Sequence, residues 1–275
     1  MTLFDAFRYD GKRALVVGGA TGMGAATAEV LQSAGAEVVV MDYAEMSLPG
    51  AKAIHVNLAE RDSIDAALEQ LGGPVHALFS CAGVADGTPG IEKINFIGHR
   101  HMIDRLLAAD LIPRGSAIGF ISSAAGLGWE SNLARIKEYL ATPDFDSAVA
   151  WVAANGGADY MSTKQAICAY VSCQALPMLK RGIRINAICP GPTDTPLARA
   201  NEEMWLGFGS DYRSEVGVEA ATALEQAYPL VFLCSAAAAS INGITLITDS
   251  GYFAAGITEV FPAATPVANF LLGRM

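Results

Sequence analysis

The stretch ALVVGGATGMGAATAE, residues 14–29, decides the fold of this 275-residue chain. It reads as an apolar strand, then a glycine-rich turn, then the start of a helix. Gly18, Gly22 and Gly24 allow the backbone to turn sharply and to approach a pyrophosphate, which the N–H groups of the following helix N-terminus would bind. A turn without a ligand is the alternative, but the order of strand, turn and helix favours a dinucleotide site.

Short apolar runs alternate with helical patterns along the rest of the chain. Strands are expected at residues 14–17, 37–41, 53–56, 77–80, 117–122, 184–188 and 243–247. Helices are expected at residues 25–34, 64–71, 94–109 and 160–180. Several of the strands are continuously apolar, as strands that are covered on both faces require. The alternation predicts one α/β domain over residues 1–275, a Rossmann-type, doubly wound parallel sheet with helices on both faces.

Three segments do not belong to a minimal version of this design. They are an insertion at about 128–157, with a helical pattern at 132–140, a substrate lid at about 196–224 and an apolar tail at about 256–275. The tail has too little polar surface to stay free in water, so we expect it to pack on a neighbouring subunit, close to that subunit's active site.

Composition excludes several classes of function. With a net charge of −10, 52% hydrophobic and 17% charged residues, the chain is predicted to be globular and to bind no nucleic acid. Its apolar runs are too short for a membrane span, and it begins with no signal-peptide pattern. Five cysteines without a CxxC pair, and four histidines without a partner, favour a reducing cytoplasm and no metal. The apolar surface predicts a homo-oligomer, a dimer or a tetramer.

An acidic residue ends the second predicted strand. Asp42 follows the glycine turn at about the 20-residue distance from which a carboxylate accepts hydrogen bonds from the adenosine ribose and repels a 2′-phosphate. Tyr43 is not basic, and Thr21 stands where a phosphate-binding cation could have been. NAD is therefore favoured over NADP, with Thr21, Met23, Asp42 and Tyr43 as contacts. The alternative is an ordinary solvated carboxylate.

Tyr160 and Lys164 lie on one face of a predicted helix. A nearby ammonium favours the phenolate, so Lys164 is expected to lower the pKa of Tyr160 and to let it transfer protons near neutral pH. A serine at the end of the strand 117–122 would hydrogen-bond the substrate oxygen. Asn95 would hold a water or a backbone carbonyl behind Lys164. Taken singly, these residues are more often surface pairs and helix caps.

Together the motifs resemble the short-chain dehydrogenase/reductase family from about residue 12 to residue 251. The resemblance implies a tetrad in which Ser123, rather than Ser122, binds the substrate oxygen and Tyr160 is the acid/base. Lys164 would also bind the nicotinamide ribose, and Asn95 would complete the tetrad. Further cofactor contacts are implied at Asn57, Leu58, Cys81, Ala82, Gly83, Pro190, Gly191, Thr193 and Thr195.

The chain departs from the family pattern at several positions. Val17 replaces a customary threonine, Ser80-Cys81 replaces Asn-Asn, and Asn57 stands where an aspartate often contacts adenine. The interval between Ser123 and Tyr160 is unusually long. A similar insertion, with the same Cys-Ala-Gly and Gly-Gly-x-x-Tyr patterns, occurs in bacterial 3α-hydroxysteroid dehydrogenase/carbonyl reductases.

The sequence thus predicts an NAD(H)-dependent oxidoreductase that interconverts a secondary alcohol and a ketone. Apolar residues in the lid and insertion favour a bulky hydrophobic substrate, steroid-like, terpenoid-like or aromatic. Two alternatives remain. One is a catalytically silent NAD sensor or scaffold, and the other is an NADP-dependent reductase of small sugar or acyl substrates. The insertion directly precedes the helix that commonly forms the contact between subunits in this family, so it is expected to block or replace part of that contact.

Overall fold

A seven-stranded parallel sheet forms the centre of the computed structural model, which describes residues 2–274. Its strand order is β3-β2-β1-β4-β5-β6-β9. The strands are β1 (Arg13–Val17), β2 (Glu37–Asp42), β3 (Lys52–His55), β4 (Ala77–Ser80), β5 (Ala117–Ile121), β6 (Arg184–Pro190) and β9 (Thr245–Thr248). The predicted fold class is therefore confirmed, with each strand close to its expected range.

The strand order reverses direction next to β1, and this positions the site. Chain segments after β1 first build outward to β2 and β3, and the chain then returns to add β4 on the other side of β1. The carboxyl ends of β1 and β4 consequently diverge into loops on opposite sides. In open α/β sheets this switch point is where nucleotides bind.

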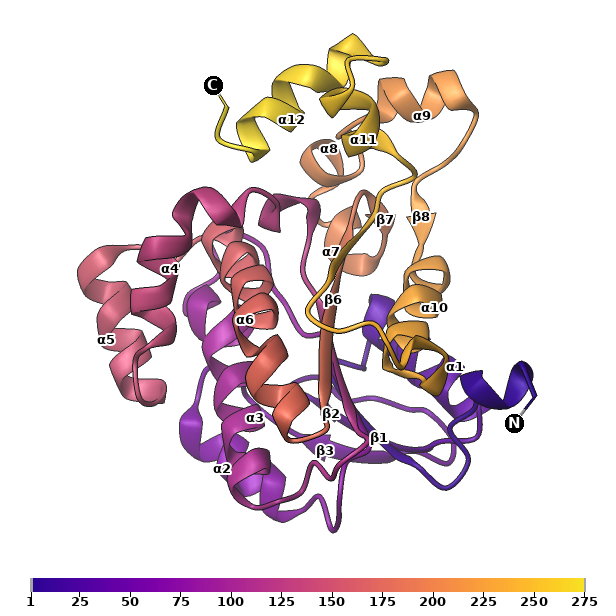
Figure 1. The fold of residues 1–275 in the computed structure, drawn as a ribbon, viewed down its shortest axis with the longest axis vertical. Helices are drawn as coiled ribbons and strands as arrows, with labels where there is room; N and C mark the ends of the chain where they lie inside the picture. Colours follow the sequence, from indigo (N-terminus) through magenta and orange to yellow (C-terminus); the bar gives the residue numbers. More distant parts are fainter. Residues whose placement is uncertain (1, 275) are drawn as a thin grey trace.

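Helices cover both faces of the sheet (Figure 1). On one face lie α2 (Arg61–Glu69), α3 (Gly98–Ala108) and α6 (Tyr160–Lys180), with the π-helical turn η2 (Lys93–Ile97) leading into α3. On the other face lie α1 (Gly22–Ser33) and α10 (Ala223–Cys234). Each face has its own core, in which the side chains of alternate strand positions pack against these helices.

Helix α10 was not among the predicted helices. Its N-terminus carries a complete capping box, in which the hydroxyl of Thr222 accepts from the backbone N–H of Glu225 and the Glu225 carboxylate accepts from the N–H of Thr222. The spacing of Thr222 and Glu225 is the sequence signal for this helix. Pro229 inside the apolar run argues against a helix in the sequence, since proline usually ends one.

The insertion folds into two further helices after the short turns η3 (Ala124–Gly126) and η4 (Trp129–Asn132). They are α4 (Leu133–Leu140), which confirms the predicted helical pattern, and α5 (Phe145–Asn155). Helix α4 packs against α6 and α5 packs against η2, with Tyr139 stacked on Trp151 at 5.1 Å between ring centroids. The insertion thus occupies the face near α6 where the family contact between subunits was expected. The homo-oligomer itself stays a prediction.

The tail begins in α11 (Tyr252–Ile257) and contains η6 (Pro262–Ala264) and α12 (Thr265–Leu271), and in Figure 1 it lies above α8 and the insertion. It packs on its own chain: Leu271 and Leu272 join a cluster with Leu127 and Trp129, and the Leu272 carbonyl accepts from the hydroxyl of Ser131 at 3.3 Å. Part of its apolar surface is thus covered by the insertion of the same chain, whereas Val260 and Phe270 remain exposed at 77% and 49%. The expectation that the tail packs on a neighbouring subunit stays a prediction.

Gly128 provides a test of this docking. It has φ +72, and a Cβ there would lie 1.6 Å from the Leu271 carbonyl oxygen. We expect Gly128→Ala to release α12, measured as faster hydrogen exchange over residues 265–272 and a lower melting temperature. Gly115→Ala is the matched control, because Gly115 has φ +92 but nothing within 4 Å of its Cβ position. Equal effects of the two substitutions would mean that backbone strain alone, and not the tail contact, is responsible.

Within the described part of the chain, no helix combines the length and the apolar character needed to cross a membrane.

Candidate active site

A cleft of about 520 Å³ opens at the carboxyl ends of β1, β2 and β4. This volume falls within the range of cofactor sites. Its lining includes most of the predicted cofactor contacts: Gly18, Thr21, Gly22, Met23, Gly24, Asp42, Tyr43, Asn57, Leu58, Cys81, Ala82, Gly83 and Thr195. The structure therefore brings together residues that are widely separated in the sequence. Pro190, Gly191 and Thr193 are not part of this lining, and neither is Lys164, which is expected to bind the nicotinamide ribose.

The glycines of the turn are required by close backbone packing as well as by a ligand. Gly18 has φ +86, and a Cβ there would lie 2.3 Å from the backbone nitrogen of Ala82. A Cβ on Gly24 would lie 1.9 Å from the Gly18 carbonyl oxygen. Gly22 has φ +57, and the side chain of Thr195 faces it from the opposite wall, 3.4 Å from its Cβ position. Helix α1 begins here, so its free N–H groups point into the cleft, where they suit a pyrophosphate.

Asp42 lies at the end of β2 and is held by two backbone groups. Its carboxylate accepts from the N–H of Ala20 at 2.8 Å and from the N–H of Ala44 at 2.9 Å. Each oxygen keeps a further lone pair for a ligand hydroxyl. Tyr43 beside it is 70% exposed. The carboxylate is thus fixed at the rim of the cleft, and nothing basic stands next to it in the chain.

The catalytic candidates meet where α6 begins, beside the end of β5. Ser122 is buried, and its hydroxyl donates to the Lys164 carbonyl oxygen at 2.9 Å, which makes it a structural residue. Ser123 is only partly buried, and it is close enough to Tyr160 to affect its pKa. The ammonium of Lys164 lies 5.4 Å from the centroid of the Tyr160 ring. Of the two serines, Ser123 is thus the one beside Tyr160, and its role toward a substrate stays a prediction.

Lys164 is buried, with 4% of its surface exposed. Its Nζ donates to the carbonyl oxygen of Ile121 at 3.1 Å. Burial lowers the pKa of Lys164 to about 8, because the charged form has lost its water. A Cβ on Gly83 would lie 3.4 Å from this Nζ and 3.5 Å from Oδ1 of Asn95. Gly83 lines the cleft, so both polar groups lie directly behind this part of its wall.

The pKa of Tyr160 differs from the expectation. Burial raises the pKa of Tyr160 to about 12, although the hydroxyl of Ser123 opposes the change. The expected lowering by Lys164 is therefore wrong for the chain alone. The physical reason is that Lys164 is itself costly to charge in this environment, and its Nζ donates to Ile121. In the chain alone Tyr160 carries its proton at neutral pH.

Asn95 lies in the π-helical turn η2 and is fully buried. Its side chain binds both backbone groups of Val84, accepting from the N–H at 2.8 Å and donating to the carbonyl at 3.1 Å. It also donates to the hydroxyl of Thr163, at 3.2 Å, in the first turn of α6. Asn95 thus holds the backbone carbonyl of Val84. Asn95 joins the loop after β4 to the catalytic helix.

Several cleft residues were missed by sequence reasoning. They carry no recognisable motif, and only their position between Gly83 and Asn95 or directly after Thr195 could have suggested them. They include Val84, Thr88, Pro89, Ile94, Pro196 and Leu197. Of the predicted loop residues, Thr195 caps the short helix α7 (Pro196–Arg199) with its hydroxyl, while Thr193 donates to the Gly191 carbonyl at 3.0 Å.

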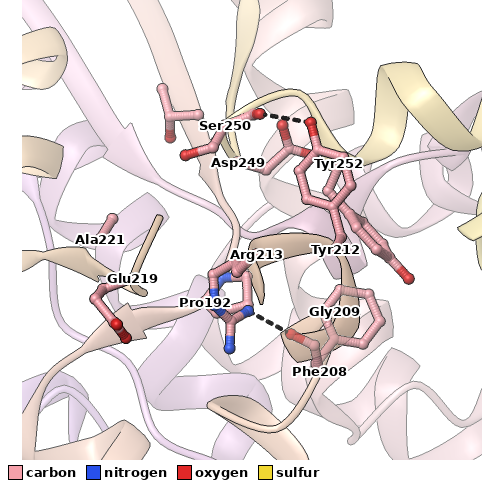
Figure 2. Close-up of a pocket in the computed structure, with 11 residues that line it drawn as sticks. Pro192, Phe208, Gly209, Tyr212, Arg213, Glu219, Ala221, Asp249, Ser250 and Tyr252 are labelled. Carbon is pink, nitrogen blue, oxygen red and sulfur yellow. Dashed lines mark hydrogen bonds between the residues drawn. The ribbon is translucent and has the colours of Figure 1, made fainter. Parts of the chain in front are cut away.

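The lid lies over the catalytic group. Trp205, on helix α8 (Glu202–Trp205), packs on Tyr160 with 5.0 Å between ring centroids. Figure 2 shows how the lid is joined to the segment after β9, through Phe208 and Tyr212 packed against Tyr252. The hydroxyl of Tyr212 donates to the Ser250 carbonyl at 3.0 Å. The cavity between them is only about 10 Å³, so this junction holds the lid and has no room for a substrate.

Comparison with known proteins identifies the family. A model described as short chain dehydrogenase matches residues 12–134, and one described as Enoyl-(Acyl carrier protein) reductase matches residues 144–253. The coniferyl-alcohol dehydrogenase of Pseudomonas sp. (strain HR199 / DSM 7063) is 30% identical over 247 residues, covering 87% of this chain and 96% of that protein. The chain is a short-chain dehydrogenase/reductase.

Other members of the short-chain dehydrogenase/reductase family agree with this assignment. The 3-alpha-hydroxysteroid dehydrogenase/carbonyl reductase of Comamonas testosteroni is 28% identical over 248 residues, covering 86% of this chain and 95% of that protein. The crystal structure of the 3-alpha-hydroxysteroid dehydrogenase from Pseudomonas sp. B-0831 complexed with NADH shares the fold, with a TM-score of 0.71 at 24% identity over 91% of this chain and 99% of that one. This short-chain dehydrogenase/reductase is an oxidoreductase of the kind that acts on CH–OH groups.

Proposed function

We propose that this enzyme is an NAD(H)-dependent dehydrogenase that interconverts a bulky hydrophobic secondary alcohol and its ketone. The observation that carries the proposal is that Ser123, Tyr160 and Lys164 converge beside Gly83, a residue that lines a cleft large enough for a dinucleotide. When bound there, the nicotinamide ring would accept or donate the hydride.

The protein's own part in the reaction is proton transfer and charge stabilisation. Tyr160 would give its proton to the carbonyl oxygen during reduction and remove it from the hydroxyl during oxidation. Ser123 would donate a hydrogen bond to the same oxygen as negative charge develops on it. Lys164 and Asn95 face the space beside Gly83, where they would hold the ribose and a proton-conducting water.

Asp42 supports NAD over NADP. Its fixed carboxylate at the rim of the cleft would accept from the ribose hydroxyls and would repel a 2′-phosphate. We expect that Asp42→Ala combined with Tyr43→Arg will shift the ratio of kcat/KM for NADP over NAD by about tenfold or more, since one repulsive charge is lost and one attractive charge is gained. Steady-state kinetics with both cofactors measure this ratio.

A second variant guards this test against misfolding. Asp42→Asn with Tyr43→Arg keeps one oxygen, which can accept from the N–H of Ala20 or from that of Ala44, whereas the alanine variant keeps neither bond. Tyr43→Arg alone is the control for the added cation. An unchanged cofactor ratio in both double variants would show that specificity is set elsewhere.

A large apolar side chain beside Tyr160 supports a bulky substrate. Trp205 packs on the Tyr160 ring, whereas Trp129 packs in the apolar cluster of the insertion and tail. The surface of Trp205 would exclude water from an alicyclic or aromatic ring. The named activities of relatives, coniferyl-alcohol dehydrogenase, (+)-borneol dehydrogenase 1 and 3-alpha-hydroxysteroid dehydrogenase, are of this type.

A screen with NAD and NADH tests the substrate class. We expect kcat/KM to be higher for members of a panel of steroid, terpenoid and aromatic alcohols and ketones than for small sugars or acyl compounds. A small hydrophilic ketone that exceeds every bulky candidate would overturn this assignment. NADH binding without turnover on any member of the panel would instead support a silent sensor.

A further inference from the structure

The N-terminus of the catalytic helix is bound by two carboxylates from different parts of the chain. Asp159, the residue before the helix, accepts from the N–H and the hydroxyl of Ser162, both at 2.7 Å. Asp86 comes from the loop after β4, and its Oδ1 accepts from the backbone N–H of Tyr160 at 2.6 Å. The first N–H groups of a helix have no acceptor within the helix, so each of these carboxylates supplies an acceptor that the helix lacks. Only Asp86 reaches across from another element, and the residue that it holds is the acid/base.

The loop that carries Asp86 is also part of the cofactor cleft. Val84, Thr88 and Pro89 line that cleft, and Val84 is held on both sides by Asn95. The bond from Asp86 therefore connects a cleft wall directly to the backbone of Tyr160. A change in the position of this loop would move the phenol relative to the cleft.

The charges around the phenol are few. From its own helix, Lys164 faces the ring, and Ser123 faces it from the end of β5. The thiol of Cys189 approaches from β6 and the carboxylate of Asp86 from the loop after β4. Asp86 and Cys189 both raise the pKa of Tyr160, with Asp86 the larger of the two. Asp86 is exposed, whereas the hydrogen bond with Cys168, together with burial, raises the pKa of the Cys189 thiol.

We propose that Asp86 is a positioning residue that fixes Tyr160 through its backbone N–H and sets, through its negative charge, the pH range in which the phenol transfers protons. The inference rests on the proposed function of Tyr160. It assigns two separable roles to one carboxylate: the oxygen acts as a hydrogen-bond acceptor and the charge acts on the phenol. A residue that only closed the loop would have the first role and not the second.

Two substitutions separate these roles. Asp86→Asn keeps an oxygen that accepts from Tyr160 and removes the charge, whereas Asp86→Ala removes both. Asp159→Asn is the matched control, because Asp159 also caps this helix but binds Ser162. The measurement is kcat for alcohol oxidation against pH, with NAD and the best substrate, at low and at high salt.

Removing a negative charge makes the phenolate easier to form, so the pH midpoint of oxidation should fall in Asp86→Asn. We expect a fall of roughly half a pH unit at low salt, with the KM for NAD unchanged. The difference from the parent enzyme should shrink at high salt, because the carboxylate is exposed and screened. Asp86→Ala should show the same fall and, in addition, a several-fold loss of kcat at the optimum pH. Asp159→Asn should move the midpoint clearly less than Asp86→Asn does, because Asp86 and not Asp159 is among the groups that act on the pKa of Tyr160.

The outcomes distinguish a failure of this inference from a failure of the proposed function of Tyr160, on which it rests. If Asp86→Asn leaves the midpoint where it is in the parent enzyme, or if Asp159→Asn moves it equally, the inference is overturned. If Tyr160→Phe retains the parent's pH profile, the proposed role of Tyr160 fails, and the inference about Asp86 fails with it. A midpoint that rises in Asp86→Asn would also contradict the proposal, because the sign would be wrong.

Discussion

Replacing Tyr160 with phenylalanine is expected to lower kcat by about 10²- to 10⁴-fold in both directions, the usual contribution of a positioned acid or base. The ring and its packing against Trp205 are kept, and only the hydroxyl is lost. NADH affinity should stay within about twofold of the parent, since the groups that face the ribose space are Lys164 and Asn95. Steady-state kinetics and NADH titration measure the two effects separately.

The pH dependence of this variant is part of the same expectation. In the chain alone the pKa of Tyr160 is raised to about 12, so the phenolate needed for alcohol oxidation becomes more abundant as pH rises, while the phenol needed for ketone reduction predominates at neutral pH. The residual activity of Tyr160→Phe should lose this alkaline rise. Tyr228→Phe removes a hydroxyl from an exposed tyrosine of α10 and should change nothing. Near-normal turnover of Tyr160→Phe at all pH values would refute the mechanism.

Lys164→Met is expected to remove activity and, at the same time, to stabilise the cofactor-free protein. A pKa lowered from 10.5 to about 8 corresponds to roughly 3 kcal/mol spent on burying the ammonium at neutral pH. Methionine has a similar length and no charge. Because methionine cannot donate to the carbonyl of Ile121, the loss of this hydrogen bond destabilises the fold by about 1 kcal/mol. The net gain of about 2 kcal/mol should raise the melting temperature by about 5 °C.

The pH dependence of this gain has a definite sign. The unfolded chain keeps the Lys164 proton up to about pH 10.5, and the folded chain loses it near pH 8. The cost is therefore fully present below pH 8 and disappears as pH rises to about 10.5, so the advantage of Lys164→Met should be largest at pH 7 and small at pH 10. Lys180→Met, at the exposed end of the same helix, is the control and should give no gain. A lower melting temperature for Lys164→Met at pH 7 would show that its charged form is well stabilised in the fold.

The fold could be predicted from the sequence because its signals are local and agree with one another. The strand at 14–17, the glycine turn and the helix after it occur in one short stretch, and Asp42 follows at the expected distance. The sheet then requires these residues to meet at one edge, since β1 and β2 are parallel neighbours in register. The composition of the cofactor cleft was predictable for the same reason.

The remaining features depend on three-dimensional surroundings that no local pattern records. The pKa of Tyr160 follows the degree of burial around it and the carbonyl to which Lys164 donates. The position of the tail depends on the close packing of the Leu271 carbonyl against Gly128. Asp86 precedes its partner Tyr160 by 74 positions in the chain, and nothing in the sequence between them indicates the contact.

The docking of α12 onto the insertion also bears on how the protein is made. Ser131 and Leu272 are 141 positions apart, so the insertion emerges from the ribosome long before its partner does. Until then Leu127 and Trp129 lack the leucines that cover them. Contacts of such long range form late and slowly, and exposed apolar surface during that interval promotes aggregation. The yield of folded protein should therefore depend on the rate of synthesis and on chaperones that shield the nascent chain.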